Sequence, residues 1–151
     1  MTENKMFPLV SVCIPNRNMA RYLEGAISSA LSQTYPNIEV ITVDNDSDDS
    51  SVQVARECAQ NDSRCRQFSN EKNIGMGANW NRCVELSQGQ YVVLLSADDT
   101  LEPNFVERCM NYHLRFQDLG YVCTEWSTLD EHGNTVSREP FYEKSGVVPA
   151  D

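Results

Sequence analysis

Short runs of apolar and β-branched residues alternate along the chain with longer stretches in which apolar residues recur every three or four positions. The short runs predict strands at residues 9–14, 38–44, 64–69, 91–96 and 121–129, and the longer stretches predict helices at residues 22–33, 51–60, 77–87 and 103–116. Parallel strands need crossover connections, and helices usually supply them. The pattern therefore predicts an α/β fold with a mostly parallel sheet covered by helices on both faces.

Helix breakers and caps support these boundaries. Pro36 is expected to end the first helical region, and Pro103 lies where the first turn of the fourth helix is expected. Residues 130–134 predict a turn, after which the pattern becomes irregular. In open parallel sheets, ligands bind beyond the carboxyl ends of the strands. The residues that follow each strand are therefore the candidates for chemistry.

Composition narrows the class of protein. The 151 residues include 12 Lys and Arg against 22 Asp and Glu, which gives a net charge of -10 and predicts no binding to nucleic acid or to an anionic membrane surface. The apolar run at residues 91–95 is too short for a transmembrane segment, and the first eight residues resemble no secretory signal, which predicts a cytoplasmic protein. The six cysteines form no C-x-x-C pair and are expected to be buried thiols.

Polar side chains follow the first two predicted strands. The first strand leads into Pro15-Asn16-Arg17-Asn18, which can bind a base or phosphate or can be an ordinary turn. Four carboxylates lie within residues 44–49, but an EF-hand loop beginning at Asp44 would need glycine at its sixth position and glutamate at its twelfth, and neither is present. Asp48 and Asp49 suit the positive end of the next helix. Asp44 is the functional candidate, since a carboxylate there can accept the imide N–H of a pyrimidine.

The third and fourth predicted strands are followed by a glycine-containing loop and by adjacent carboxylates. Gly75 and Gly77 open the backbone just before a helix, where a phosphate can approach closely. Trp80, a little further on, is expected to lie in the core. Asp98 and Asp99 come directly after an apolar strand, so they either cap a helix or hold a metal. A divalent cation, Mn²⁺ or Mg²⁺, would allow a diphosphate to bind beside them.

Together these segments resemble the nucleotide-binding part of a family 2 glycosyltransferase. The resemblance covers residues 8–134 and rests on VSVCIPNRN (10–18), ALSQTYPNIEV (30–40), VDN (43–45), NIGMGANWNR (73–82), GQY (89–91) and LSADD (95–99). Each segment is weak evidence alone, but their order along the chain is specific. The resemblance implies a GT-A (Rossmann-like) fold, a three-layer α/β/α sandwich.

The resemblance also implies roles for individual residues. Pro15, Arg17 and Asn18 would line the base and ribose pocket, Asp44 would bind the uracil edge, Asn73 and Gly75 would border the nucleotide, Asp98 would contact the ribose or donor sugar, and Asp99 would ligate the metal. Two positions depart from the family pattern. Arg17 stands where members often have an aromatic residue, which weakens the case for base stacking there. Ser96 stands where many have aspartate, and it can hydrogen-bond but supplies no carboxylate to a metal.

The activity implied is transfer of a sugar from a nucleotide-diphosphate sugar, expected to be a UDP-sugar, to an acceptor hydroxyl with inversion and metal assistance. The acceptor would be a glycan or a lipid-linked molecule in bacterial-type polysaccharide, lipopolysaccharide or glycolipid synthesis. The catalytic base is unassigned, because no carboxylate in residues 125–151 lies in a recognisable base motif. The alternative is a non-catalytic nucleotide-sugar-binding module. A phosphotransferase with a nucleophilic aspartate is disfavoured, because the first strand ends in Ile14-Pro15 rather than aspartate.

The end of the chain bears on its organisation. Residues 145–151 have neither a helix cap nor a closing amphipathic element. We therefore expect residues 1–151 to form a single nucleotide-sugar-binding domain that is truncated before the acceptor-binding part. Apolar surface left uncovered is expected to favour self-association into a homo-oligomer. The missing part or a partner could place the protein at the periphery of a membrane.

Overall fold

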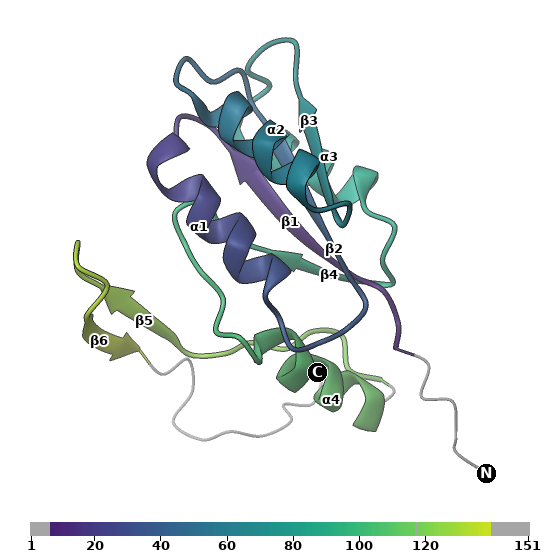
Figure 1. The fold of residues 1–151 in the computed structure, drawn as a ribbon. Coiled ribbons are helices and arrows are strands. Elements are labelled where there is room, and N and C mark those ends of the chain that lie inside the picture. Colours follow the sequence, from purple (N-terminus) through teal and green to yellow (C-terminus); the bar gives the residue numbers. More distant parts are fainter. Residues whose placement is uncertain (1–6, 117, 140–151) are drawn as a thin grey trace. The chain divides into compact units, whose positions relative to one another are not determined.

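The computed structural model describes residues 7–116 and 118–139 (Figure 1). The chain divides into two units, Met1–Arg108 and Cys109–Asp151. The elements of the first unit are β1 (Val10–Asn16), α1 (Ala20–Leu31), β2 (Ile38–Asp44), α2 (Ser51–Asn61), β3 (Cys65–Ser69), α3 (Met76–Leu86) and β4 (Tyr91–Leu94). The helix α4 (Phe105–Arg115) crosses the boundary, and the second unit contains β5 (Trp126–Leu129) and β6 (Thr135–Glu139).

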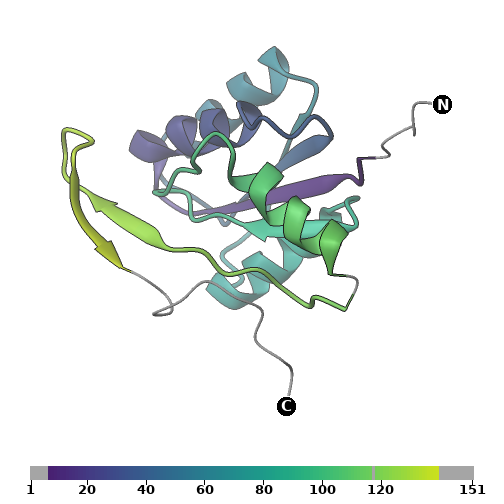
Figure 2. The same cartoon turned by 90° about the horizontal axis from the view of Figure 1, so that it is seen from below.

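The first unit is built on a four-stranded sheet with the order β3-β2-β1-β4. Each neighbouring pair of strands in it is parallel. Figure 2 shows α1 and α2 on one face of this sheet and α3 on the other. The predicted alternation of strands and helices and the three-layer arrangement are confirmed.

The two faces of the sheet bury alternate residues of the same strand, as the two-residue period of a β-strand requires. Val12 and Ile14 of β1 pack with Leu23 and its neighbours on α1. Cys13, between them in the sequence, packs on the other side with Cys83 of α3. The near-continuous apolar runs of β1 and β2 are thus explained by burial on both faces.

A buried charged cluster lies at the amino-terminal end of the sheet. Glu39 is 6% exposed, and its Oε1 accepts hydrogen bonds from Ser11 Oγ at 2.7 Å and from the Gln88 amide at 2.6 Å. Its Oε2 accepts from Arg66 Nη1 at 2.9 Å. The Gly89 amide donates to Ser11 Oγ at 2.8 Å. We call Ser11, Glu39, Arg66 and Gly89 the Glu39 cluster.

The second unit differs from the sequence-based expectation. The predicted strand at residues 121–129 is confined to Trp126–Leu129, and it pairs antiparallel with β6 rather than extending a parallel sheet. The sequence predicts irregular structure after residue 134, and this prediction is wrong for residues 135–139, which form β6. This short strand, TVSRE, is mostly polar, and Val136 is exposed, so no apolar alternation marked it. The predicted turn is confirmed, with Asp130 Oδ1 accepting from the Asn134 amide at 2.8 Å.

The six cysteines all lie in the described residues, form no disulfide and differ in burial. Burial raises the pKa of Cys13, Cys65 and Cys83 to about 12, so these thiols are inert at neutral pH. Cys123 is exposed, and for this residue the expectation of burial is wrong. Within residues 7–116 and 118–139, no helix has the length and hydropathy needed to span a bilayer.

Candidate functional site

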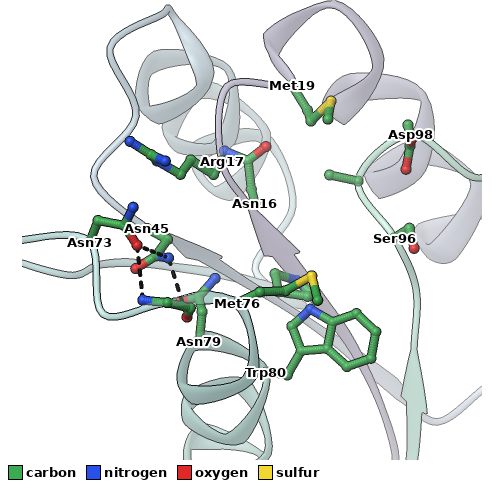
Figure 3. Close-up of a pocket in the computed structure, with 13 residues that line it drawn as sticks. Asn16, Arg17, Met19, Asn45, Asn73, Met76, Asn79, Trp80, Ser96 and Asp98 are labelled. Atoms are coloured by element: carbon green, nitrogen blue, oxygen red, sulfur yellow. Dashed lines mark hydrogen bonds between the residues drawn. The ribbon is translucent and has the colours of Figure 1, made fainter.

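A pocket of about 360 Å³ opens at the carboxyl ends of the strands in the first unit (Figure 3). The residues that line it come from the end of β1, from the loops after β1, β2, β3 and β4, and from the start of α3: Pro15, Asn16, Arg17, Met19, Asn45, Asn73, Gly75, Met76, Asn79, Trp80, Ser96, Ala97 and Asp98. Its location is where the strand-end rule predicts a ligand. Five of the eight predicted site residues lie in this lining, and Asn18, Asp44 and Asp99 do not.

One wall of the pocket is held by a network of four asparagine side chains: Asn45, Asn70, Asn73 and Asn79. Asn45 Nδ2 donates to Asn73 Oδ1 at 2.9 Å (Figure 3). Asn45 Oδ1 accepts from the Ile74 amide at 3.0 Å. Asn70 Nδ2 donates to Asn45 Oδ1 at 3.1 Å and to Asn79 Oδ1 at 2.8 Å. We call these four residues the asparagine network.

The asparagine network fixes the loop that enters α3. Gly75 precedes α3 with φ of 88°, a left-handed conformation that favours glycine, and its amide donates to Asn73 Oδ1 at 2.9 Å. Asn79 Nδ2 donates to the carbonyl of Val43 at 3.1 Å, which ties α3 to β2. The amino-terminal end of α3, with its positive dipole, therefore borders the pocket in a fixed position.

The loop between β1 and α1 is held by side chains from the loop after β2. Asn18 Oδ1 accepts from the Asp48 amide at 2.8 Å, and the Asn18 amide donates to Ser47 Oγ at 2.9 Å. Asp49 accepts from the Ser51 amide at 3.0 Å and from the Ala20 amide at 2.9 Å, so one carboxylate serves the starts of both α1 and α2. The predicted placement of Asp49 at the start of the second helix is confirmed.

Asp44 is 3% exposed and its carboxylate is already partnered. Oδ1 accepts from Asn16 Nδ2 at 2.7 Å and from Ser47 Oγ at 2.6 Å, and Oδ2 accepts from the Ser47 amide at 2.9 Å. The predicted contact with a base would require this carboxylate to exchange one of these bonds for the imide N–H. That role stays a prediction.

The carboxylates after β4 lie at the opposite wall. Asp98 lines the pocket together with Ser96, and Asp99 follows it. Burial and the charge of Asp98 raise the pKa of Asp99, although a hydrogen bond from Ser96 opposes this rise. A divalent cation would relieve the repulsion between the two carboxylates, and hard oxygen ligands suit Mn²⁺ or Mg²⁺.

The metal would need ligands beyond these side chains. In the described parts of the chain, no group of three or more His, Cys, Asp or Glu residues could hold a metal ion. The chemistry of Asp98 and Asp99 still fits a cation whose other ligands are water or diphosphate oxygens, because Mg²⁺-type sites commonly use one or two carboxylates and substrate phosphates.

Trp80 lies in the pocket lining with 39% of its surface exposed, so the expectation that it belongs to the core is wrong. Met76 and Met19 lie with it in the lining and are also exposed (Figure 3). The sequence pattern placed Asn16 in a candidate binding segment without a role of its own, and it did not single out Asn45. Asn45 is next to Asp44, and Asn16 is the last residue of β1, the position from which a side chain can reach the crevice.

The fold is an α/β domain with a pocket at the carboxyl ends of its strands, and comparison with known proteins specifies the family. Residues 11–145 match the description Glycosyl transferase family 2. The chain is 35% identical over 149 residues to chondroitin synthase from Escherichia coli, across 97% of this chain and 22% of that protein. It is 33% identical over 130 residues to hyaluronan synthase from Pasteurella multocida, across 86% of this chain and 13% of that protein.

The chain therefore belongs to glycosyl transferase family 2. It spans about a fifth of the chondroitin synthase and a smaller share of the hyaluronan synthase. Among solved structures, it resembles S. aureus TarS 1–349 with a TM-score of 0.66 and 22% identity, across 72% of this chain and 33% of that one. It also resembles the mannosyltransferase PcManGT from Pyrobaculum calidifontis, with a TM-score of 0.58 and 25% identity, across 64% of this chain and 29% of that one. The predicted GT-A fold is confirmed.

Proposed function

We propose that this chain supplies the donor site of an inverting glycosyltransferase that uses a UDP-sugar. The observation that carries the proposal is the pocket at the strand ends, where Arg17, the amino-terminal end of α3 and Asp98 line one cavity. Structures of TarS with UDP and with UDP-GlcNAc, and of PcManGT with GDP-Man and Mn²⁺, support nucleotide-sugar chemistry in proteins of this fold.

In this proposal the parts of the donor bind different walls. The base and the ribose bind on the side of the pocket formed by Pro15, Arg17 and Asn18. Asp44 lies next to this side, outside the pocket lining. Asn73 and Gly75 border the nucleotide, and the fixed start of α3 presents amide groups that suit phosphate oxygens. Asp98 contacts the ribose or the donor sugar.

Asp99 would hold Mn²⁺ or Mg²⁺. When bound, the cation supplies positive charge that stabilises the diphosphate as a leaving group. The contribution of this chain is the carboxylate of Asp99, whose pKa is raised by its burial and by the neighbouring charge of Asp98. A hydrogen bond from Ser96 opposes this rise.

Transfer also needs an acceptor hydroxyl and a base that removes its proton. In the proposed reaction, an acidic side chain takes that proton and the oxygen attacks the anomeric carbon in line with the departing diphosphate. We place the base and the acceptor surface outside the pocket residues, which leaves this chain able to bind the donor. The names of the relatives, a chondroitin and a hyaluronan synthase, support an acceptor that is a glycan. A lipid-linked acceptor, and a place in cytoplasmic or membrane-peripheral polysaccharide, lipopolysaccharide or glycolipid synthesis, belong to the proposal without such support.

Titration with UDP in the presence and absence of Mn²⁺ tests the donor site. Wild-type protein is expected to bind UDP more tightly with Mn²⁺, and Asp99→Asn, a nearly isosteric change, is expected to remove the Mn²⁺ dependence while the fold is kept. Asp98→Asn is expected to weaken UDP-sugar binding more than it weakens the metal effect. Asp48→Asn is the matched control, because Asp48 is exposed and lies outside the pocket lining. Unchanged metal dependence in Asp99→Asn would contradict its assignment.

The second candidate, a nucleotide-sugar-binding module without transferase activity, is separated by an activity assay. We expect residues 1–151 to bind UDP and Mn²⁺ but to show at most slow donor hydrolysis, and a longer natural chain to restore transfer. Rapid transfer to an added acceptor by residues 1–151 alone would place the base within this chain, with Glu125, Asp130 and Glu131 as the first residues to test.

A further inference from the structure

Two buried side-chain oxygens in the described part of the chain lack a hydrogen-bond partner: Asn16 Oδ1 and Thr42 Oγ1. Thr42 lies in the middle of β2, where it is surrounded by the sheet. Asn16 is the last residue of β1, is 3% exposed and lies in the lining of the pocket. Asn16 borders the pocket, whereas Thr42 does not, so a ligand in the pocket lies next to the residue that carries the unpaired oxygen.

The orientation of the Asn16 amide is fixed by its neighbours. Nδ2 donates to Asp44 Oδ1 at 2.7 Å and to Ser47 Oγ at 3.3 Å. If the amide were turned over, Oδ1 would face the carboxylate oxygen of Asp44, and two acceptors at that distance repel each other. The carbonyl oxygen must therefore point away from Asp44. Figure 3 shows the amide between Arg17 and Met19, both of which line the pocket.

An unpaired acceptor in this place is unusual, because nearly all buried polar groups in native proteins have a partner. A serine or threonine at position 16 would offer Asp44 a hydroxyl donor and would leave no carbonyl without one. By contrast, the amide of Asn45, in the same lining, has partners for both its oxygen and its nitrogen. Asn16 thus differs from Asn45 in that its side-chain carbonyl oxygen has no hydrogen-bond donor.

The chemistry of the acceptor selects the part of the ligand that it can bind. Phosphate oxygens carry no donor at neutral pH, so a carbonyl oxygen gains nothing from them. A nucleoside offers both the imide N–H of its base and the hydroxyls of its ribose. Asn16 is also adjacent to Arg17, on the side of the pocket where we place the base and ribose, whereas Asp98 follows β4.

We propose that Asn16 Oδ1 accepts a hydrogen bond from the nucleoside of the donor and thereby determines specificity. This inference rests on the proposed function and adds a residue to its site. Asp44 then acts as a positioning residue, because its carboxylate holds Asn16 Nδ2 and turns the carbonyl oxygen toward the ligand.

Calorimetric titration with UDP and three analogues tests the proposal. N3-methyl-UDP lacks the imide donor, and 2′-deoxy-UDP and 3′-deoxy-UDP each lack one ribose hydroxyl. Wild-type protein is expected to bind one of these analogues about tenfold more weakly than UDP. Asn16→Ser, which keeps a hydroxyl near Asp44 but removes the carbonyl, is expected to bind UDP about tenfold more weakly than wild type and to bind that analogue no worse than UDP.

The outcomes separate the inference from the proposed function. If wild-type protein binds UDP but binds all three analogues equally well, the inference is overturned without any variant. It is also overturned if Asn16→Ser folds and keeps the full discrimination of the wild type. Failure of wild-type protein to bind UDP would instead contradict the proposed function itself. Thr42→Val is the control, since it alters the other unpaired oxygen and is expected to leave UDP affinity unchanged.

Discussion

The two ends of the four-stranded sheet both bury polar side chains, but they differ in what they leave open. At the amino-terminal end, the carboxylate of Glu39 accepts three hydrogen bonds, and Arg66 balances its charge. At the carboxyl-terminal end, neutral amides of the asparagine network stand beside a pocket of about 360 Å³. There, Asn16 Oδ1 has no partner.

This difference indicates that the buried polar residues at one end of the sheet stabilise the fold, whereas those at the other end serve ligand binding. The groups of the Glu39 cluster satisfy one another, and removing one of them leaves a buried charge uncompensated, so the cluster should affect stability. The groups around the pocket hold a loop and leave an acceptor open, so they should affect binding. Substitutions at the two ends should therefore separate stability from nucleotide affinity.

Glu39→Gln is expected to have the largest effect on stability, a loss of about 3 kcal/mol at neutral pH, because it places an amide against Arg66 and removes the charge that balances it. Burial acts to raise the pKa of Glu39, but hydrogen bonds from Ser11, from the Gln88 amide and from Arg66 outweigh it, and the pKa is lowered overall. Stabilisation by a carboxyl of lowered pKa is complete above the ordinary glutamate value of about 4.3 and is lost as pH falls through the lowered pKa.

Urea unfolding of wild type and Glu39→Gln at several pH values checks both parts of this prediction. The gap in the free energy of unfolding should be widest near pH 7 and should narrow as the pH falls below about 4.3. UDP affinity should be the same in both proteins at pH 7. A large drop in UDP affinity in Glu39→Gln would contradict the idea that the Glu39 cluster affects stability alone.

Gly89→Ala is expected to cost about 2 kcal/mol, because the added methyl group meets a crowded backbone. A Cβ at position 89 would lie 2.6 Å from Ser11 Oγ and 2.8 Å from the carbonyl oxygen of Leu9. Gly25→Ala is the matched control: Gly25 is exposed within α1, and a Cβ at position 25 would meet no atom within 4 Å, so this change should raise stability by about 1 kcal/mol. Thermal unfolding of the two variants should shift in opposite directions, and equal shifts would contradict the geometry.

Asn45→Ala is expected to cost about 1–2 kcal/mol in stability and to weaken UDP binding by about tenfold. The loss of its amide releases Asn73 and the Ile74 amide, which hold the loop before α3. Gln53→Ala is the control, because this amide pairs with Glu57 on α2, away from the pocket lining. If Asn45→Ala lost stability but bound UDP as tightly as wild type, the asparagine network would serve the fold alone, like the Glu39 cluster.

Thr42→Val is expected to have the smallest effect, a gain of about 1 kcal/mol, because it replaces a buried hydroxyl that lacks a partner with a methyl group. Chemical unfolding measures the change. A loss of stability would show that the hydroxyl of Thr42 is hydrogen-bonded in solution, for example to a buried water.

Much of the first unit could be predicted because its signals are local. The apolar run at residues 38–44 predicted the observed bounds of β2. The rule that ligands bind beyond the carboxyl ends of parallel strands predicted the location of the pocket. The hydrogen bond between Asp44 and Asn16 could not be predicted, because only folding brings the ends of β1 and β2 together. Asn16 is 28 residues away in sequence, yet it donates to Asp44 Oδ1.

Trp80 shows how periodicity can select the wrong face of a helix. Met76, Trp80 and Val84 recur every four residues on α3, which predicts an apolar stripe packed on the core. In the structure these three residues are exposed, and Asn79 and Cys83 are the buried residues of α3. The hydrogen bond from Asn79 Nδ2 to the Val43 carbonyl helps to set the rotation of the helix, and no pattern of hydropathy contains that information.

We propose above that the pocket at the carboxyl ends of the strands binds a nucleoside diphosphate. A titration of ¹⁵N-labelled protein with UDP and Mg²⁺, followed by NMR, tests this proposal. Chemical-shift changes are expected to concentrate at Asn16, Arg17, Gly75, Ser96 and the indole N–H of Trp80, with the Gln88 and Gly89 amides unchanged. Shift changes confined to residues outside the pocket lining, or no changes at saturating UDP, would contradict it.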